Sequence, residues 1–213
     1  MLLYVQAVRA SPRRIRPLMV RMSRVSESPS FFFLKNSLIS LYLFLMTSSF
    51  DLPFYESGTI EKLPMTEKDV DIVRKLITEV KPHQIYVAGD LADPHGTHRK
   101  CTDAVLAAID LEKEAKAEWL KDCRIWMYRG AWAEWEIENI EMCVPMSPEE
   151  LRGKRNSILK HQSQMESAPF LGNDERLFWQ RSEDRNRNTA KIYDNLGLAC
   201  YEAMEAFVEY KPL

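Results

Sequence analysis

The sequence predicts an α/β layered fold with a mainly parallel sheet. Patterns typical of helices and strands alternate from Thr66 onward, as expected when helices connect parallel strands. The 213 residues, of which 46% are hydrophobic and 28% charged, provide enough chain for one full core and not for two. The net charge of −2 gives no reason to expect nucleic acid or a membrane surface as a partner. We therefore expect one α/β domain.

The first predicted helix begins at Thr66 and ends before Pro82. Thr66 is followed by first-turn acids, and apolar residues then recur at helical spacing. Residues 83–90 form a β-branched and aromatic run that ends in Gly-Asp, which predicts a buried strand followed by a loop. Between Thr102 and about Leu120, aliphatic residues alternate with Glu and Lys, so a second helix is expected there.

Two more strands and two more helices are predicted after this point. Short strands are expected at 124–128 and 139–144. A Ser cap, a Pro at the first helical position and a Glu at the third predict a helix over 147–164. Residues 189–210 have the pattern of a last amphipathic helix, interrupted or kinked at Gly197.

Residues 1–49 differ from the rest of the chain in charge and pattern. They carry a net charge of +6, whereas residues 50–213 carry −8. An apolar run at 31–46 follows an Arg-rich stretch, which is the charge order of a signal anchor. Lys35 and Asn36 interrupt this run, however, and leave fewer apolar residues in a row than the ~20 that a spanning helix needs. We favour a segment that is not native to the domain, an extension or an artefact, over a weak membrane anchor.

The four cysteines are predicted to be reduced and mostly buried. They are Cys101, Cys123, Cys143 and Cys200, and no two of them form a C-x-x-C pair. Scattered cysteines in apolar or helical surroundings are typical of a reducing compartment, so we expect a cytoplasmic protein. A four-cysteine zinc site is not expected, because structural zinc sites usually take their ligands from closely spaced pairs.

Two of the four histidines, His95 and His98, lie in one loop between a predicted strand and a predicted helix. Ligands bind at this end of the strands in parallel α/β sheets. Two imidazoles three residues apart can point into one cleft if the second begins a helix, which suits a metal ligand beside a charge-stabilising group. The pattern also fits a polar loop in which His95 caps a helix and His98 is solvated, because short motifs have many false positives.

Two segments carry motifs that are specific in combination. Residues 89–98 read Gly-Asp-Leu-Ala-Asp-Pro-His-Gly-Thr-His, and residues 151–164 contain Lys-Arg followed by Leu, His and Ser-Gln. They resemble the H-x-x-H and K-R-x-x-L-x-x-H-x-S-Q motifs of the LmbE/PIG-L family of zinc-dependent deacetylases. With residues 50–55, the likeness is to the C-terminal domain of two-domain bacterial proteins whose N-terminal half is a glucosamine-6-phosphate deaminase. The resemblance covers residues 50–213 and implies a Rossmann-type three-layer fold without its N-terminal part.

The resemblance implies roles for residues of the histidine loop. His98 would be a zinc ligand, and His95 would stabilise the oxyanion or protonate the leaving amine, while Asp93 and Arg99 are candidates for substrate contact. Zinc would activate a water for attack on an acetamide carbonyl. The family takes two further ligands and a base from an H-P-D-D type motif, yet this sequence has no Asp-Asp pair, and residues 1–49 hold neither His nor Asp.

These expectations lead to two hypotheses for function. In the first, the chain is part of a zinc-dependent amino-sugar N-deacetylase, a hydrolase acting on N-acetylglucosamine-type amides, and is inactive alone. In the second, it is a non-catalytic module that binds a sugar phosphate or assembles with a glucosamine-6-phosphate deaminase. Both predict a small amino sugar as ligand, and both allow a homo-oligomer or a deaminase domain as partner.

Several other residues allow two interpretations each. Four aromatic residues could stack on a sugar ring, although such density is more typical of a core or an interface. They are Trp126, Tyr128, Trp132 and Trp135. Arg129 could bind a phosphate or form a surface ion pair, and His161 could be structural or lie near the site. Residues 181–187 mix charges of both signs, which is typical of a solvated helix face.

Overall fold

A computed structural model describes residues 4–6, 52–54, 63–89, 96–129, 133–160, 175–198 and 200–211. Its centre is a five-stranded sheet in the order β1-β2-β3-β5-β4. The strands are β1 (Tyr4–Gln6), β2 (Gln84–Ala88), β3 (Arg124–Tyr128), β4 (Met142–Met146) and β5 (Ala203–Tyr210). The helices are α1 (Glu67–Val80), α2 (Thr97–Glu114), α3 (Pro148–Leu159) and α5 (Phe178–Asn195), with two short 3-10 helices, η2 (Glu118–Asp122) and η3 (Ile137–Asn139).

The sheet is mixed rather than mainly parallel. β2 and β3 pair in parallel, with Ile85 opposite Ile125 and Ala88 opposite Tyr128. β1 pairs with β2 in the antiparallel sense, and β5 pairs with both β3 and β4 in the same way. The predicted α/β class is confirmed, but the predicted mainly parallel sheet is wrong. The difference arises from β5, which enters the sheet between β3 and β4 in the reverse direction.

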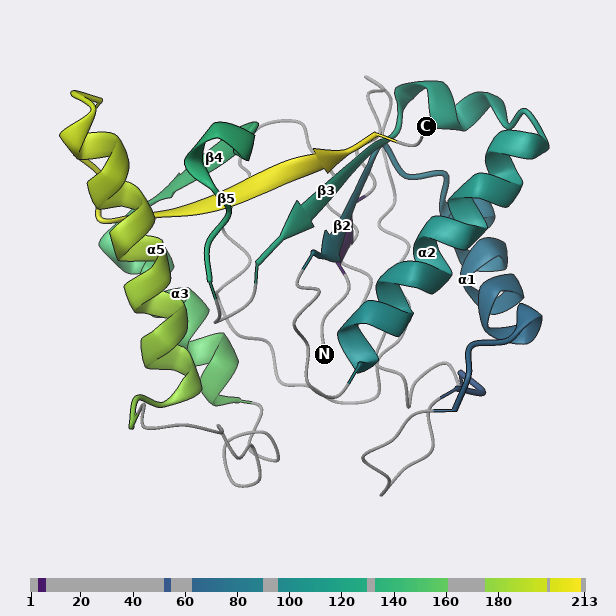
Figure 1. Cartoon of the computed structure of the whole chain (residues 1–213), viewed down its shortest axis with the longest axis horizontal. Helices are drawn as coiled ribbons and strands as arrows, with labels where there is room; N and C mark the ends of the chain where they lie inside the picture. The colour runs from purple at the N-terminus through teal and green to yellow at the C-terminus, as the bar shows by residue number, and fades with distance from the viewer. Residues whose placement is uncertain are drawn as a thin grey trace, which may run out of the picture.

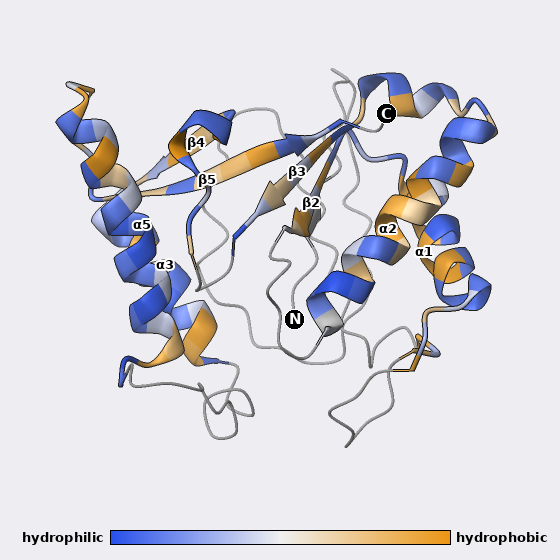
Figure 2. Cartoon of the chain, in the orientation of Figure 1, coloured by the Kyte–Doolittle hydropathy of each residue, from blue (hydrophilic) through white to orange (hydrophobic). Residues whose placement is uncertain are grey.

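Helices cover both sides of the sheet. Figure 1 shows α1 and α2 on one side and α3 and α5 on the other. The apolar core lies with α1 and α2, and its fully buried large side chains include Phe54, Ile77, Ile85 and Val105. Figure 2 shows apolar residues along α1 and α2, whereas α5 is hydrophilic over most of its length. The two helix pairs are therefore attached to the sheet by different kinds of contact.

The caps predicted for two helices form in the structure. One oxygen of Asp69 accepts hydrogen bonds from the backbone nitrogen and the hydroxyl of Thr66, both at 2.7 Å. Its other oxygen accepts from the nitrogen of Phe54 at 2.9 Å, which ties α1 to the preceding segment. At α3, the nitrogen of Ser147 donates to Glu150 at 2.6 Å, and the Ser147 hydroxyl accepts from the nitrogen of Glu150 at 3.3 Å. The predicted starts of both helices are confirmed.

The predicted helix over 189–210 is wrong in its second half. Helix α5 ends at Asn195, and Gly197 has a φ of +83°, so the glycine predicted to kink the helix follows its end. Residues 203–210 form β5 instead. Ala, Met and Glu in this stretch favour a helix locally, but pairing with β3 and β4 on both sides overrides that preference.

The solvated helix face predicted at residues 181–187 is also wrong. These residues belong to α5, and they bury Ser182, Glu183, Arg185 and Asn186. The side chains are polar, yet ion pairs and hydrogen bonds to α3, β5 and residue 134 satisfy most of their donors and acceptors. Mixed charge in the sequence therefore marks an internal interface here.

Three elements have other boundaries in the structure than the sequence predicted. Helix α2 begins earlier than Thr102 and ends at Glu114, shortly before Lys116 takes a left-handed φ of 55°. Strand β4 lies at Met142–Met146 rather than at 139–144, because Ile137–Asn139 form η3. Helix α3 ends at Leu159, and residues 161–164 lie outside the described part of the chain.

The thiols follow the prediction for three of the four cysteines. All four are free; Cys101 is buried, Cys123 and Cys143 are partly buried, and Cys200 is exposed. Burial raises the pKa of Cys123 to about 12, which keeps that thiol protonated near neutral pH. The exposed Cys200 departs from the expectation because it lies between α5 and β5 rather than in a helix.

The N-terminal segment is described only at the backbone of β1, and its apolar run at 31–46 lies outside the described residues. Among the helices that are described, none is long and apolar enough to cross a membrane.

Candidate functional site

The loop that carries the histidines joins the carboxyl end of β2 to the start of α2. Gly96 precedes the helix with a φ of +67°, a left-handed conformation that favours glycine. The nitrogen of Lys100 donates to the carbonyl of Gly96 at 3.0 Å and closes the first helical turn. The buried hydroxyl of Thr102 donates to the carbonyl of Ala88 at 2.7 Å. The end of β2 and the beginning of α2 are thus held together.

The predicted site residues fall partly within the described chain. His98 lies in the first turn of α2 and is partly buried, and Arg99 beside it is exposed. His95 and Asp93 lie outside the described residues. Because α2 begins at Thr97, the structure meets the condition under which an H-x-x-H pair can point into one cleft. The catalytic, metal-binding and substrate-binding roles of these residues stay predictions.

Trp135 packs against the carboxyl end of β2. The nitrogen of Gly89 donates to the carbonyl of Tyr128 at 2.8 Å, which continues the parallel pairing past the end of β2. A Cβ placed on Gly89 would lie 2.7 Å from Cη2 and Cζ2 of Trp135 and 2.8 Å from Cβ of Met127. Only a residue without a side chain allows this approach. An indole therefore covers the sheet edge directly before the histidine loop.

Arg129 follows β3 at the same edge and stacks on Trp135. The guanidinium carbon lies 4.1 Å from the centroid of the indole, within the range of a favourable cation–π contact. Trp126 is buried, and Tyr128 and Trp135 are partly buried, which agrees with a mainly structural role for the aromatic cluster. Trp132 lies outside the described residues.

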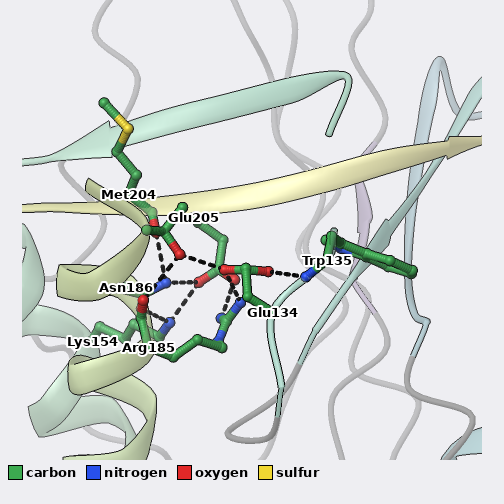
Figure 3. Close-up of polar contacts among 8 residues, drawn as sticks. Glu134, Trp135, Lys154, Arg185, Asn186, Met204 and Glu205 are labelled. Carbon is green, nitrogen blue, oxygen red and sulfur yellow. Dashed lines mark hydrogen bonds and ion pairs between the residues drawn. The ribbon is translucent and has the colours of Figure 1, made fainter. Parts of the chain in front are cut away.

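An ion-pair network holds the residue that precedes Trp135 (Figure 3). One oxygen of Glu134 accepts from Arg185 at 2.9 Å and from the Thr189 hydroxyl at 2.6 Å, both in α5. The other accepts from the backbone nitrogen of Trp135 at 3.0 Å. In Figure 3, Glu134 is directed toward α5, whereas the indole of Trp135 points away from it. The position of Trp135 therefore depends on how Glu134 is held by α5.

Glu205 of β5 belongs to the same network. Arg185, whose side chain is 5% exposed, pairs with both Glu134 and Glu205. Lys154 donates to Glu205 and to Asn186, both at 2.6 Å. Burial acts to raise the pKa of Glu205, but the charges of Lys154 and Arg185 outweigh it and lower that pKa to about 2. Burial acts to lower the pKa of Arg185, and its two carboxylate partners raise it instead.

Lys154 and Arg155 are the Lys-Arg pair of the segment that resembles the deacetylase helix. Arg155 pairs with Glu183 through two hydrogen bonds of 2.5 and 2.7 Å, and its guanidinium carbon lies 4.6 Å from the centroid of Trp179. Lys154 reaches β5 through Glu205. In the described structure, this pair therefore attaches α3 to α5 and to the sheet. His161 of the same segment lies outside the described residues.

Acid is expected to weaken the fold through Glu205. Its pKa is about 2 in the folded chain against an ordinary value of 4.5, so its stabilisation is complete above about pH 5 and is lost as the pH falls toward 2. We expect this group to lower the free energy of unfolding by up to about 3 kcal/mol over that range. Urea unfolding at a series of pH values measures the effect.

Two variants make this measurement specific. Glu205→Gln should flatten the fall in stability, because it removes the titrating group. Glu202→Gln should leave the fall unchanged, since Glu202 forms a more exposed ion pair with Arg187. A Glu205→Gln variant that loses stability as steeply as the original chain would contradict the assignment.

The described residues do not fit a catalytic zinc. Such a site needs three protein ligands around the metal. Within the ranges that the structure describes, no group of three or more His, Cys, Asp and Glu side chains could hold a metal ion. We therefore derive no chemical step through zinc, and the role of His98 as its ligand stays an expectation from the resemblance.

Sequence reasoning missed the contact of Gly89 with Trp135 and the ion-pair network. The first had a signal, because a glycine at the end of a strand often marks a close approach. Glu205 had none, since its neighbours Met204 and Ala206 favour a helix and concealed the strand.

No family model matches the chain, and two similar solved structures are only weakly alike. A 4-carboxy-2-hydroxymuconate hydratase from Pseudomonas putida has a TM-score of 0.49 and 11% identity, over 71% of this chain and 61% of that one. A triple mutant of a deacetylase from the teicoplanin biosynthetic pathway has a TM-score of 0.43 and 18% identity, over 69% of this chain and 59% of that one. Likenesses of this size assign neither a fold family nor a function.

A curated sequence gives a much closer match. A glucosamine-6-phosphate deaminase-like protein of Bacteroides thetaiotaomicron is 83% identical over 163 residues, which are 76% of this chain and 25% of that protein. The chain thus spans about a quarter of the length of this relative. The predicted relationship to proteins of this kind is confirmed. Over most of its length, the chain is a close homologue of one part of a glucosamine-6-phosphate deaminase-like protein.

Proposed function

We propose that this chain is part of an amino-sugar N-deacetylase-type domain, and that its 213 residues alone bind an amino sugar without hydrolysing its amide. The observation that carries this proposal is the start of α2 at Thr97, which places His98 in the first turn beside the carboxyl end of β2. Ligands bind at this edge where parallel strands end. The resemblance of residues 89–98 and 151–164 to LmbE/PIG-L enzymes, and the name of the relative, support the amino-sugar class.

The absence of hydrolysis follows from the residues that the chain contains. The deacetylase motif that supplies two zinc ligands and a base includes an Asp-Asp pair, and none occurs in this sequence. A single imidazole from the H-x-x-H motif does not make the three-ligand site that activates a water. We therefore expect binding without turnover.

Calorimetry and acetate release test the proposal on the full 213-residue chain. We expect glucosamine or N-acetylglucosamine to bind, and no acetate to be released from N-acetylglucosamine or its 6-phosphate. His98→Ala should weaken the binding. His83→Gln is the matched control, because His83 directly precedes β2 and so lies at the opposite end of that strand. Stoichiometric zinc with acetate release that requires His98, or no sugar binding at all, would refute the proposal.

A second candidate function is a non-catalytic sugar-phosphate-binding or assembly module. The stacking of Arg129 on Trp135 at the same edge favours it, because a guanidinium there suits a phosphate. The relative's name also refers to glucosamine 6-phosphate. Sugar-phosphate binding that is indifferent to zinc and to His98→Ala would support this second candidate over the first.

A further inference from the structure

Thr102 of α2 closes the end of strand β2. Its hydroxyl donates to the carbonyl of Ala88, the last residue of β2, at 2.7 Å, and both residues are buried. A buried carbonyl that loses its donor becomes an unsatisfied acceptor, which costs free energy. The next residue, Gly89, donates its backbone nitrogen to the carbonyl of Tyr128. The polar groups at the end of β2 are therefore satisfied by α2 and by β3.

His98 lies on the same face of α2 as Thr102. The two residues are four positions apart, so their side chains lie one above the other, about 6 Å apart along the helix axis. His98 is partly buried, whereas its neighbour Arg99 is exposed, as expected if this face is turned toward the sheet. Because Thr102 contacts the last residue of β2, His98 lies one turn nearer to the loop that follows this strand.

The hydrogen bond of Thr102 also fixes how α2 is rotated about its own axis. The core contacts of α2 include Cys101 and Val105, and such apolar contacts are non-directional. Lys100 joins the first turn to the chain before α1, but through a long and flexible side chain. The threonine side chain is short and stiff, and its hydrogen bond weakens when the angle at the donor changes. A rotation that broke this bond would move the imidazole of His98 across the end of the sheet.

We infer that Thr102 is a positioning residue that acts through His98, because its hydrogen bond to Ala88 sets where the imidazole lies beside the carboxyl end of β2. The inference rests on the proposed function, in which His98 contributes to the binding of the amino sugar. It adds the residue that places His98 for that contact. Thr102 itself is buried and acts on the ligand only through His98.

The position of the imidazole can be measured without any ligand. The His98 ring signals in an NMR spectrum of the full chain are assigned as those that disappear in His98→Ala. Thr102→Val keeps the shape of the side chain and removes the donor, so we expect it to shift these signals. Thr102→Ser keeps the hydroxyl and should restore them. Thr78→Val is the matched control, because the Thr78 hydroxyl donates to a carbonyl within α1, that of Arg74, at 2.7 Å.

Calorimetry with glucosamine measures the effect on binding. We expect Thr102→Val to weaken the affinity about three- to tenfold, the range of one lost hydrogen bond, and Thr102→Ser and Thr78→Val to leave it unchanged. Thr102→Val combined with His98→Ala should bind as weakly as His98→Ala alone, because a residue that acts through His98 has no effect without it. Urea unfolding confirms that each variant is folded, and Thr102→Ala carries the test if the Val variant is not.

The outcomes distinguish this inference from the proposed function. His98 signals that shift in Thr102→Val and not in Thr102→Ser, in a chain that binds no sugar, would support the inference and refute the proposed function. Sugar binding that requires His98 and is equally tight in Thr102→Val would overturn the inference and leave the proposed function standing. Unchanged His98 signals in Thr102→Val, or losses of affinity that add in the double variant, would also overturn the inference.

Discussion

Arg185→Met is expected to lower the free energy of unfolding by about 3–5 kcal/mol. Arg185 is 5% exposed and is shared by the carboxylates of Glu134 and Glu205. Methionine fills a similar volume but removes the charge. Lys154 is then the cation that remains near Glu205, beside the Asn186 amide, and Glu134 keeps its hydrogen bonds from Thr189 and the Trp135 nitrogen. A partly buried carboxylate that has lost its cation costs more than an exposed one.

Urea unfolding of the purified chain measures this loss. Arg187→Met is the matched control, because Arg187 lies on the same helix and pairs with Glu202 with 44% of its side chain exposed. We expect the control to cost less than about 1 kcal/mol. Adding Glu134→Gln to Arg185→Met should recover part of the loss, since it removes one of the abandoned charges. Equal costs for Arg185→Met and Arg187→Met would show that the buried network does not hold α5.

The two helix pairs therefore respond to different perturbations. On the α1 and α2 side, residues such as Ile77, Ile85 and Val105 bury apolar surface and carry no titrating group. On the other side, ion pairs of Arg185 and Glu183 attach α5 to its neighbours. Acid protonates the carboxylates and so weakens this attachment. Because Glu134 is bound to α5 and directly precedes Trp135, we expect a change on the α5 side to affect the contact of Trp135 with Gly89.

Local signals predicted the starts of helices, and nonlocal pairing decided the last strand. Thr66 and Ser147 could be recognised as caps because their partners, Asp69 and Glu150, lie only three residues away. Strand β5 is defined by partners in β3 and β4, far away in the sequence. Phe207, Val208 and Tyr210 favour a strand, but the Ala, Met and Glu residues beside them favour a helix, so local propensity did not decide and the prediction failed there.

The candidate site also combines a feature with a local signal in the sequence and features without one. A helix that begins at His98 was named as the condition for a site, although the predicted helix itself began only at Thr102; in the structure α2 begins at Thr97. The network around Glu205 links residues up to 55 positions apart, as in the pair of Thr189 with Glu134. The resemblance to the deacetylase helix marked Lys154 and Arg155 as notable residues, and only the structure shows that they attach α3 to α5 and β5.

Gly89→Ala is expected to lower stability by about 1–3 kcal/mol through overpacking. The new Cβ would meet Cη2 and Cζ2 of Trp135 at 2.7 Å and Cβ of Met127 at 2.8 Å. The indole can move aside, but the Met127 Cβ is fixed to β3, so the backbone of one strand has to shift. Gly89 does not have a positive φ, so the penalty is steric rather than conformational. A displaced indole should also disturb the stacking of Arg129 on Trp135.

Gly153→Ala is the matched control for this effect, because a Cβ at Gly153 meets nothing within 4 Å and the residue lies inside α3. It should be neutral or stabilise the chain by up to about 1 kcal/mol, since alanine favours a helix over glycine. Adding Trp135→Leu to Gly89→Ala should relieve the clash with the indole but not the one with Met127. The double variant should therefore lose less stability than the two single variants lose together. Urea unfolding gives all four values. If Gly89→Ala is as stable as Gly153→Ala, then Trp135 does not pack against the end of β2.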